Sequence, residues 1–265
     1  MEIFESHAHY DDEKFEMDRE EIIKSAYNSG VTKIISAGYS LEGSKRSIEL
    51  SDKYPFIYST AGISPNDINE NYEQEIDEID QILFNIFGEK GKPAKKIVAV
   101  GEIGLDYHYD TDKEKQKIAF IKQIHIANKY NLPIVIHTRE AVMDTIQILK
   151  ENQVNRRGVF HCCPFNRELV KEALKLGFYI SFSGTVTFKN AKNAKEIVNM
   201  VPNDRFLVET DSPYLAPEPV RGTRNDSRNL KYIINKISAF RGEEPETVAK
   251  QAYQNTMRLY KIGNA

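Results

Sequence analysis

The sequence contains no long apolar run and only two cysteines. None of its apolar runs approaches the roughly 20 residues that a membrane-spanning helix requires, so no membrane partner is expected. The first residues are acidic and contain no basic leader followed by an apolar stretch, which predicts no secretory signal. The cysteines, Cys162 and Cys163, are adjacent, and adjacent cysteines rarely form a disulfide bond without backbone strain. These features favour a reducing cytoplasm as the setting.

The chain also has no excess of basic residues, since 36 Lys and Arg face 39 Asp and Glu. This balance excludes a uniformly basic nucleic-acid-binding surface, although a local basic patch would not change the sum. We find no Gly-rich dinucleotide or phosphate-loop motif, no internal repeat and no low-complexity linker. The 265 residues, 40% of them apolar, are enough to bury a large core, and barrels of this length commonly form one domain.

Short apolar or β-branched runs recur along the chain, and most precede a stretch with helical spacing of apolar residues. Strands are predicted over residues 2–5, 31–37, 56–61, 97–101, 133–137, 158–161, 178–182 and 206–209. Helices are predicted over residues 16–29, 40–53, 70–88, 113–130, 140–152, 167–176, 190–199, 227–240 and 245–260. Eight alternating units predict an α/β fold, a (β/α)8 TIM barrel that forms a single domain over residues 1–265. An open doubly wound sheet is the alternative.

Residues of the kinds that bind metal ions lie at the ends of predicted strands. His7 and His9 are two residues apart on an extended segment, so their side chains project from the same side. Taken alone, this pair could equally be two histidines of the core or the surface. Four further candidates follow predicted strands: Glu102 in IVAVGE, His137 in PIVIH, His161 in GVFH and Asp211 after FLVET. In a barrel these strand ends meet on the face that carries active sites, which favours metal binding.

This set of side chains predicts a site for two metal ions. Four imidazoles and two carboxylates exceed the ligands of one tetrahedral cation but suit two divalent ions, Mg, Mn or Zn, that share a carboxylate. Such a pair can lower the pKa of a bound water and bind both the attacking and the leaving oxygen, so hydrolysis of an ester or amide is expected. His125 is expected to pack or face solvent, whereas His108, in a loop, is expected to support the site or touch substrate.

The residues resemble the TatD-type metal-dependent deoxyribonucleases, a branch of the amidohydrolase-like TIM barrels. The resemblance runs nearly end to end, through SHAHYDD, AGISP, VGEIGLDYHYD, LPIVIHTREA, FHC, SFSGTVTFKNAK, VETDSPYLAP and PVRGTRN. It implies a (β/α)8 barrel with two divalent ions. It also implies the distribution of ligands, with His7, His9, Glu102 and Asp211 at one ion and Glu102, His137 and His161 at the other.

The resemblance implies a function as well, because members of this family hydrolyse phosphodiester bonds in DNA, often as 3'-5' exonucleases on single strands. The expected substrate is therefore a single-stranded DNA end, and no obligate protein partner is expected. Asp211 is the best candidate to accept the proton of the attacking water, and Glu102 to bridge the two ions. Glu209 could orient metal ligands or could be the buried partner of a basic group.

Two other functions stay open at this point. The first is hydrolysis of an ester, amide or lactone by another metal-dependent enzyme of the same barrel, because the ligand set does not distinguish these substrates from a phosphodiester. The second is a protein whose metals are structural, or that binds nucleic acid without cleaving it. Closed structural sites need no bridging carboxylate, which disfavours the second alternative.

Several basic side chains are expected near the catalytic face in spite of the acidic net charge. Arg139, Arg221 and Arg224 are predicted to contact substrate, because guanidinium groups suit phosphate oxygens and because phosphate sites of this fold often follow the last strands. Alternatively, the arginines pair with nearby acids. For Arg228 and Lys189, a solvated face explains the charge at least as well.

The sequence departs from the family pattern at three places. Ser64 stands where the family commonly has histidine, HCCPFN replaces a more usual HCF segment, and Ser227 stands where proline is common. None of these is a predicted metal ligand, so the departures bear on substrate and rate. Cys162 and Cys163 are expected to be small buried hydrophobes, with a Cys–His nucleophile as the unsupported alternative. The acids beside the first histidines, Glu5, Asp11 and Asp12, are expected to be solvated or to support the ligands.

Overall fold

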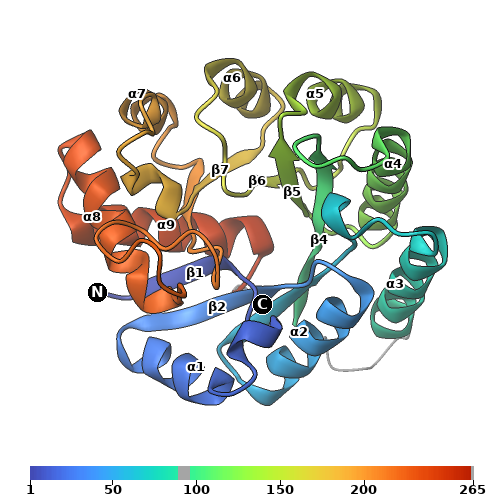
Figure 1. Cartoon of the computed structure of the whole chain (residues 1–265), viewed down its shortest axis with the longest axis horizontal. Coiled ribbons are helices and arrows are strands. Elements are labelled where there is room, and N and C mark those ends of the chain that lie inside the picture. The colour runs from blue at the N-terminus through green and yellow to red at the C-terminus, as the bar shows by residue number, and fades with distance from the viewer. Residues whose placement is uncertain (89–95, 264–265) are drawn as a thin grey trace. The chain divides into compact units, whose positions relative to one another are not determined.

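Strands and helices alternate along the chain of the computed structural model, which describes residues 1–88 and 96–263 (Figure 1). The strands follow one another in a single sheet in chain order, from β1 to β8. Their bounds are β1 Ile3–Ala8, β2 Val31–Ala37, β3 Ile57–Ala61, β4 Ile97–Asp106, β5 Ile134–Arg139, β6 Gly158–Phe160, β7 Tyr179–Phe182 and β8 Phe206–Val208. Every predicted strand is confirmed.

Each predicted helix is confirmed as well, most of them within two or three residues at each end. The α-helices are α1 Arg19–Asn28, α2 Leu41–Lys53, α3 Tyr72–Phe87, α4 Lys113–Lys129, α5 Val142–Glu151, α6 Arg167–Lys175, α7 Ala194–Met200, α8 Leu230–Arg241 and α9 Pro245–Tyr260. Short 3-10 turns cover η1 Glu13–Phe15, η2 Pro65–Asp67, η3 Gly184–Thr187 and η4 Ser227–Asn229. Over the described ranges, no helix is both long and apolar enough to cross a membrane.

Three strands differ from their predicted bounds in a way that matters for the site. The strand predicted to end at residue 101 extends to Asp106, so Glu102 lies inside β4 and not at its end. Likewise, β1 extends to Ala8 and contains His7, and β5 extends to Arg139 and contains His137. The strands are longer because ladder pairing with a neighbouring strand continues through glycine and polar residues, which strand propensity alone does not favour.

The chain divides into two compact units, one made of residues 1–35 with the chain from residue 160 onward, and one made of residues 36–159. In the second unit β4 pairs in parallel with both β3 and β5. Residues 97–100 and 134–136 are buried, as expected for parallel strands covered on both faces. Helices α2, α4 and α5 pack on β3, β4 and β5 respectively (Figure 1).

Two glutamine side chains of α4 bind the backbone at the end of β4 and in the segment after β3. Gln116 is fully buried; its Oε1 accepts from the Asp106 N–H and its Nε2 donates to the Asp106 carbonyl oxygen. Gln123 forms the same pair of bonds with the backbone of Ile63. Because buried amides must be hydrogen-bonded, these two glutamines fix where β4 ends and where the segment after β3 runs.

In the first unit β7 pairs in parallel with β8, and α9 packs on β1, β8 and α8. The Ser6 hydroxyl of β1 donates to the Val208 carbonyl oxygen of β8. The buried Asn255 of α9 donates to the carbonyl oxygens of Asn203 and Phe206, which fixes the start of β8. Within this unit, β1 and β8 therefore hold a fixed relation to each other. The prediction of a single domain over residues 1–265 stays a prediction.

Candidate metal centre

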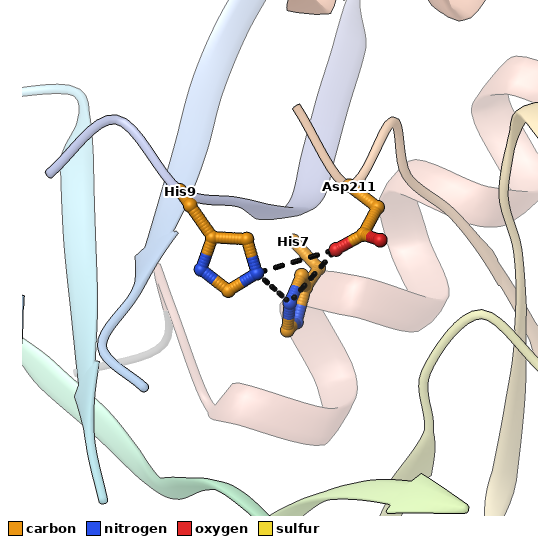
Figure 2. A group of neighbouring side chains, drawn as sticks. All are labelled: His7, His9 and Asp211. Carbon is orange, nitrogen blue, oxygen red and sulfur yellow. Dashed lines mark hydrogen bonds and ion pairs between the residues drawn. The ribbon is translucent and has the colours of Figure 1, made fainter. Parts of the chain in front are cut away.

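Three of the predicted ligands converge in the first unit. His7 lies in β1, His9 follows that strand, and Asp211 follows β8. The Nε2 atoms of the two histidines are 3.1 Å apart, and they lie 3.5 and 3.2 Å from Oδ1 of Asp211 (Figure 2). We call these residues the His7 group. Their convergence confirms that the HxH spacing directs both rings to the same side.

Backbone hydrogen bonds hold the segment after β8 against the end of β1. The Asp211 N–H donates to the His7 carbonyl oxygen over 3.0 Å, and the His9 N–H donates to the Ser212 carbonyl oxygen over 2.7 Å. Asp211 has a φ of 58°, the left-handed conformation that aspartate tolerates better than most residues. The turn is closed when the Tyr214 N–H donates to the Asp211 carbonyl oxygen. This geometry directs the carboxylate at the two imidazoles.

The His7 group fits a divalent cation in its chemistry. One ligand atom from each of its three residues lies within 4.8 Å of the others, and both histidines are buried. Burial raises the pKa of Asp211, but the contacts with His9, His161 and His7 outweigh it and leave that pKa below its usual value. An ionised carboxylate with two imidazoles is a donor set that suits Zn²⁺ and other divalent first-row ions.

His161, a fourth predicted ligand, belongs to the same unit and stacks on His7, with ring centroids 4.1 Å apart and planes 12° from parallel. Behind it lies Glu209, which is 1% exposed. Its Oε1 is 3.5 Å from His161 Nδ1 and accepts a hydrogen bond from the Cys162 N–H. In the described ranges, no Lys or Arg lies within ion-pair distance of Glu209. This contact supports the role of orienting a ligand over pairing with a distant cation.

The second unit holds the other two predicted ligands, Glu102 and His137. The Nδ1 atom of His137 is 2.8 Å from Oε1 of Glu102, while its Nε2 atom is 2.9 Å from Oδ2 of Asp106. We call these three residues the His137 group. The imidazole lies between two carboxylates, one on each ring nitrogen. A metal-binding histidine is commonly held in this way, with a carboxylate on the nitrogen that does not bind the ion.

Asp106 was missed by the sequence analysis. It is fully buried and also accepts from Asn66 Nδ2 over 3.2 Å and from the His108 N–H over 2.9 Å. Burial raises its pKa, but the hydrogen bonds from His137 and His108 outweigh burial, so the net pKa is lowered. The signal that could have found it is the period of two along β4, which places Glu102, Gly104 and Asp106 on one face.

Gly104 allows β4 to lie close enough to β5 for this group to form. It pairs with His137 in the ladder and has a φ of 141°. A Cβ atom at this position would lie 2.0 Å from the His137 carbonyl oxygen. Only glycine combines this conformation with so close a backbone approach. The glycine between the two carboxylates is therefore required by the geometry of the His137 group.

The three predicted substrate-binding arginines have different surroundings. Arg139 and Arg221 are exposed and lie over aromatic rings, 5.5 Å from the Tyr109 centroid and 4.0 Å from the Phe188 centroid. Arg224 instead forms a two-pronged ion pair with Asp18. Arg228 pairs with Asp226, in line with the alternative that the loop arginines pair with nearby acids. Lys189 is exposed.

The remaining candidates lie as follows. His108 binds no predicted ligand; its Nδ1 atom is 2.8 Å from Oε1 of Glu140, and both side chains are exposed. His125 is exposed on α4, as expected. Cys163 is buried, as expected, whereas Cys162 is half-buried, with its Sγ atom 3.1 Å from the Ser183 hydroxyl oxygen. Burial raises the pKa of both thiols, which disfavours a thiolate nucleophile.

The acids beside the first histidines are buried, which excludes the solvated positions and leaves their support of the metal ligands as a prediction. Glu5, Asp11 and Asp12 are at most 3% exposed. Glu5 accepts hydrogen bonds from the N–H and hydroxyl of Thr210 and from the His7 N–H. Burial raises its pKa to about 8, although those hydrogen bonds lower it. Its partner Thr210 is 205 residues away in sequence, so the pattern around the histidines could not reveal this contact.

The departure at Ser64 has a local structural role. Its hydroxyl accepts from the Asn66 N–H and caps η2, where Pro65 occupies the first position of the turn. Asn66 in turn donates to Asp106. Ser227 likewise accepts from the Tyr10 hydroxyl over 2.8 Å. Both serines therefore support backbone near a ligand group.

The fold and these ligand groups define the class of the protein. It is a metal-dependent hydrolase built on a (β/α)8 barrel, the fold predicted from the alternation of strands and helices. A crystal structure of YJJV, a TatD homologue from Escherichia coli, matches it with a TM-score of 0.89 at 26% identity over 98% of both chains. This match confirms the fold class.

The chain belongs to the TatD family, because the model described as "TatD related DNase" matches residues 4–261. It is 38% identical over 262 residues to the "uncharacterized metal-dependent hydrolase YabD" of Bacillus subtilis, a match covering 98% of this chain and 99% of that protein. It is 30% identical over 256 residues to the "3'-5' ssDNA/RNA exonuclease TatD" of Citrobacter rodentium, a match covering 94% of each. The resemblance inferred from the motifs is thereby confirmed.

Proposed function

We propose that the protein is a TatD-type deoxyribonuclease that removes nucleotides from the 3' end of single-stranded DNA in the cytoplasm. The observation that carries the proposal is the convergence of His7, His9 and Asp211 in a chain whose family match spans residues 4–261. The name of the Citrobacter relative supports the direction of cleavage and the single-stranded substrate. No obligate protein partner is included in the proposal.

In this proposal the predicted ligands would hold two divalent ions, Mg, Mn or Zn. His7, His9, Asp211 and His161 would contribute from the first unit, and Glu102 and His137 from the second. When bound, the ions would lower the pKa of a water and neutralise charge on the phosphodiester. The identity and number of the ions belong to the proposal.

The protein side chains then have distinct roles. Asp211 accepts the proton of the attacking water, since it is an ionised carboxylate at the edge of its group with 13% of its side chain exposed. Glu102 would be the carboxylate that the two ions share. Asp106 holds a proton on Nε2 of His137 and so leaves Nδ1 to face Glu102. Glu209, whose Oε1 atom is 3.5 Å from Nδ1 of His161, would orient that ring.

Arg139 and Arg221 are proposed to contact phosphate groups of the substrate. Both are exposed, and neither forms an ion pair with any residue in the described ranges. Arg224 was predicted with them, and its contact with substrate stays a prediction. Its guanidinium group forms an ion pair with Asp18. A local positive charge of this kind suffices for a polyanionic substrate in spite of the net charge of -3.

The test offers the purified protein with Mg²⁺, Mn²⁺ or Zn²⁺ a panel of substrates: end-labelled single- and double-stranded DNA, RNA, and small esters, amides and lactones. We expect divalent-dependent release of nucleotides from the 3' end of single-stranded DNA. Asp211→Asn and Glu102→Ala should abolish it, whereas Asp204→Asn, at an exposed carboxylate paired with Arg205, should not. Intact nucleic acids together with turnover of an ester, amide or lactone would show that the protein is a different hydrolase of this barrel.

A further inference from the structure

An exposed aromatic ring lies beside the His137 group in the second unit. Tyr109, in the segment after β4, is 52% exposed, and the Arg139 guanidinium carbon lies 5.5 Å from its ring centroid. The His108 ring meets Tyr109 edge-on, with centroids 5.1 Å apart and planes at 80°. We call Tyr109 and Arg139 the tyrosine platform. The pair offers a ligand a π-face and a positive charge side by side.

The register of β4 and β5 fixes the platform relative to the ligands. Gly104 pairs with His137 and Asp106 pairs with Arg139. Arg139 therefore follows His137 by two residues on the same side of β5, about 7 Å further along the strand. The Tyr107 N–H donates to the Arg139 carbonyl oxygen over 2.9 Å, which ties the segment bearing Tyr109 to the end of β5. Arg139 of the platform thus lies on β5, two residues beyond the predicted metal ligand His137.

Neighbouring contacts hold the segment without neutralising the arginine. Glu140, the nearest carboxylate in sequence, is 2.8 Å from Nδ1 of His108. The hydroxyl of Tyr107 donates to Asp144, which also pairs with Lys117. Arg139 itself forms no ion pair with any residue between 1 and 88 or between 96 and 263. Its positive charge is consequently available to an anion, in contrast to Arg224.

We propose that the tyrosine platform binds the nucleotide next to the cleaved phosphodiester, with its base stacked on Tyr109 and its phosphate against Arg139. This inference rests on the proposed function and names a binding site for it. An exposed ring suits any base, because every base offers a π-face, and a guanidinium suits phosphate oxygens. In a duplex the faces of each base are covered by its neighbours, so the platform favours a single strand.

The test measures binding of a fluorescein-labelled, hydrolysis-resistant phosphorothioate decamer of thymidine to the Mn²⁺-loaded protein by fluorescence anisotropy. Tyr109→Ala should weaken binding about 5- to 100-fold, the range seen when one stacked base loses its aromatic partner. Tyr109→Phe should keep most of the affinity, since stacking needs the ring and not the hydroxyl. Arg139→Gln should weaken binding and reduce the slope of log affinity against log salt by about one.

Matched controls in the same unit are Phe84→Ala, an aromatic that is 51% exposed on α3, and Arg46→Gln, an exposed arginine on α2. Both should bind the decamer like the wild type. Calorimetric titration with Mn²⁺ should give wild-type affinity for Tyr109→Ala, which separates loss of the platform from damage to the ligands.

Two results would overturn the inference: unchanged binding by Tyr109→Ala and Arg139→Gln, or no binding of the decamer by the wild type. These results are distinct from failure of the proposed function. DNA hydrolysis with unchanged binding by the variants rejects only the platform. Platform-dependent binding without hydrolysis of any nucleic acid rejects only the nuclease.

Discussion

Replacing Asp106 with asparagine should weaken metal binding although Asp106 is not itself expected to bind an ion. Its carboxylate accepts three hydrogen bonds, from His137 Nε2 at 2.9 Å, Asn66 Nδ2 at 3.2 Å and the His108 N–H at 2.9 Å. An ionised carboxylate only accepts, so it fixes a proton on Nε2 of His137 and leaves Nδ1, which faces Glu102, to bind a cation.

An asparagine cannot meet all three donors, because its NH2 group must take the place of one oxygen. In either orientation of the amide the negative charge beside His137 is lost, and when the NH2 group replaces Oδ1 it also opposes the His108 N–H. When the NH2 group replaces Oδ2, His137 avoids it by moving its proton to Nδ1. That tautomer has no lone pair directed at Glu102. Loss of such a carboxylate partner typically costs about 10- to 100-fold in metal affinity, or about 1.4 to 2.7 kcal/mol.

The assay is calorimetric titration of Asp106→Asn with Mn²⁺, with thermal unfolding of the metal-free protein to show that the variant folds. The matched control is Asp144→Asn, which removes a carboxylate of the same unit that contacts Tyr107 and Lys117 and not His137. The control should bind Mn²⁺ as the wild type does. Wild-type affinity in a folded Asp106→Asn protein would refute the positioning of His137 by Asp106.

Three further substitutions test other parts of the structure. Gly104→Ala should lower the free energy of unfolding by at least ~2 kcal/mol in urea titrations and impair Mn²⁺ binding, because its Cβ atom would meet the His137 carbonyl oxygen at a φ that alanine avoids; wild-type stability would contradict this. Arg224→Gln should cost at most ~1 kcal/mol at pH 7, since the pair with Asp18 is part-exposed. Because the hydrogen bond from Arg224 lowers the pKa of Asp18, that contribution is fully present above the pKa of Asp18 in the unfolded chain and is lost as the pH falls through the lowered pKa of the folded protein; a difference that persists below it would show another cause. Arg221→Gln should leave the unfolding midpoint unchanged but weaken decamer binding with a smaller salt slope, and unchanged binding would remove Arg221 from the substrate contacts.

Much of the fold could be predicted because its signals are local. The helix α9 and the strand β2 have the predicted bounds, since periodic apolar residues mark both. The ligands could be proposed because metal-binding side chains recur just where predicted strands end. The later course of β4 could not, because Gly104 and Asp106 have weak strand propensity and pair only through their register with β5.

Contacts between residues distant in sequence could not be predicted. The acidic side chain of Glu5 suggests an exposed position, yet it is buried and accepts a hydrogen bond from Thr210. Likewise, Asp18, the partner of Arg224, lies 206 residues away in the sequence. Asp106 lies beyond residue 101, where the strand was predicted to end, so its bond to His137 could not be inferred from the predicted bounds. Such pairings depend on tertiary packing, which a single sequence does not report.

The most direct test of the account is a crystal structure of the Mn²⁺-soaked protein with anomalous diffraction data at the manganese edge. We expect two anomalous peaks per chain, bound by residues of the predicted set His7, His9, Glu102, His137, His161 and Asp211. Fewer than one occupied position per chain at saturating Mn²⁺, or a peak bound by other residues, would contradict it.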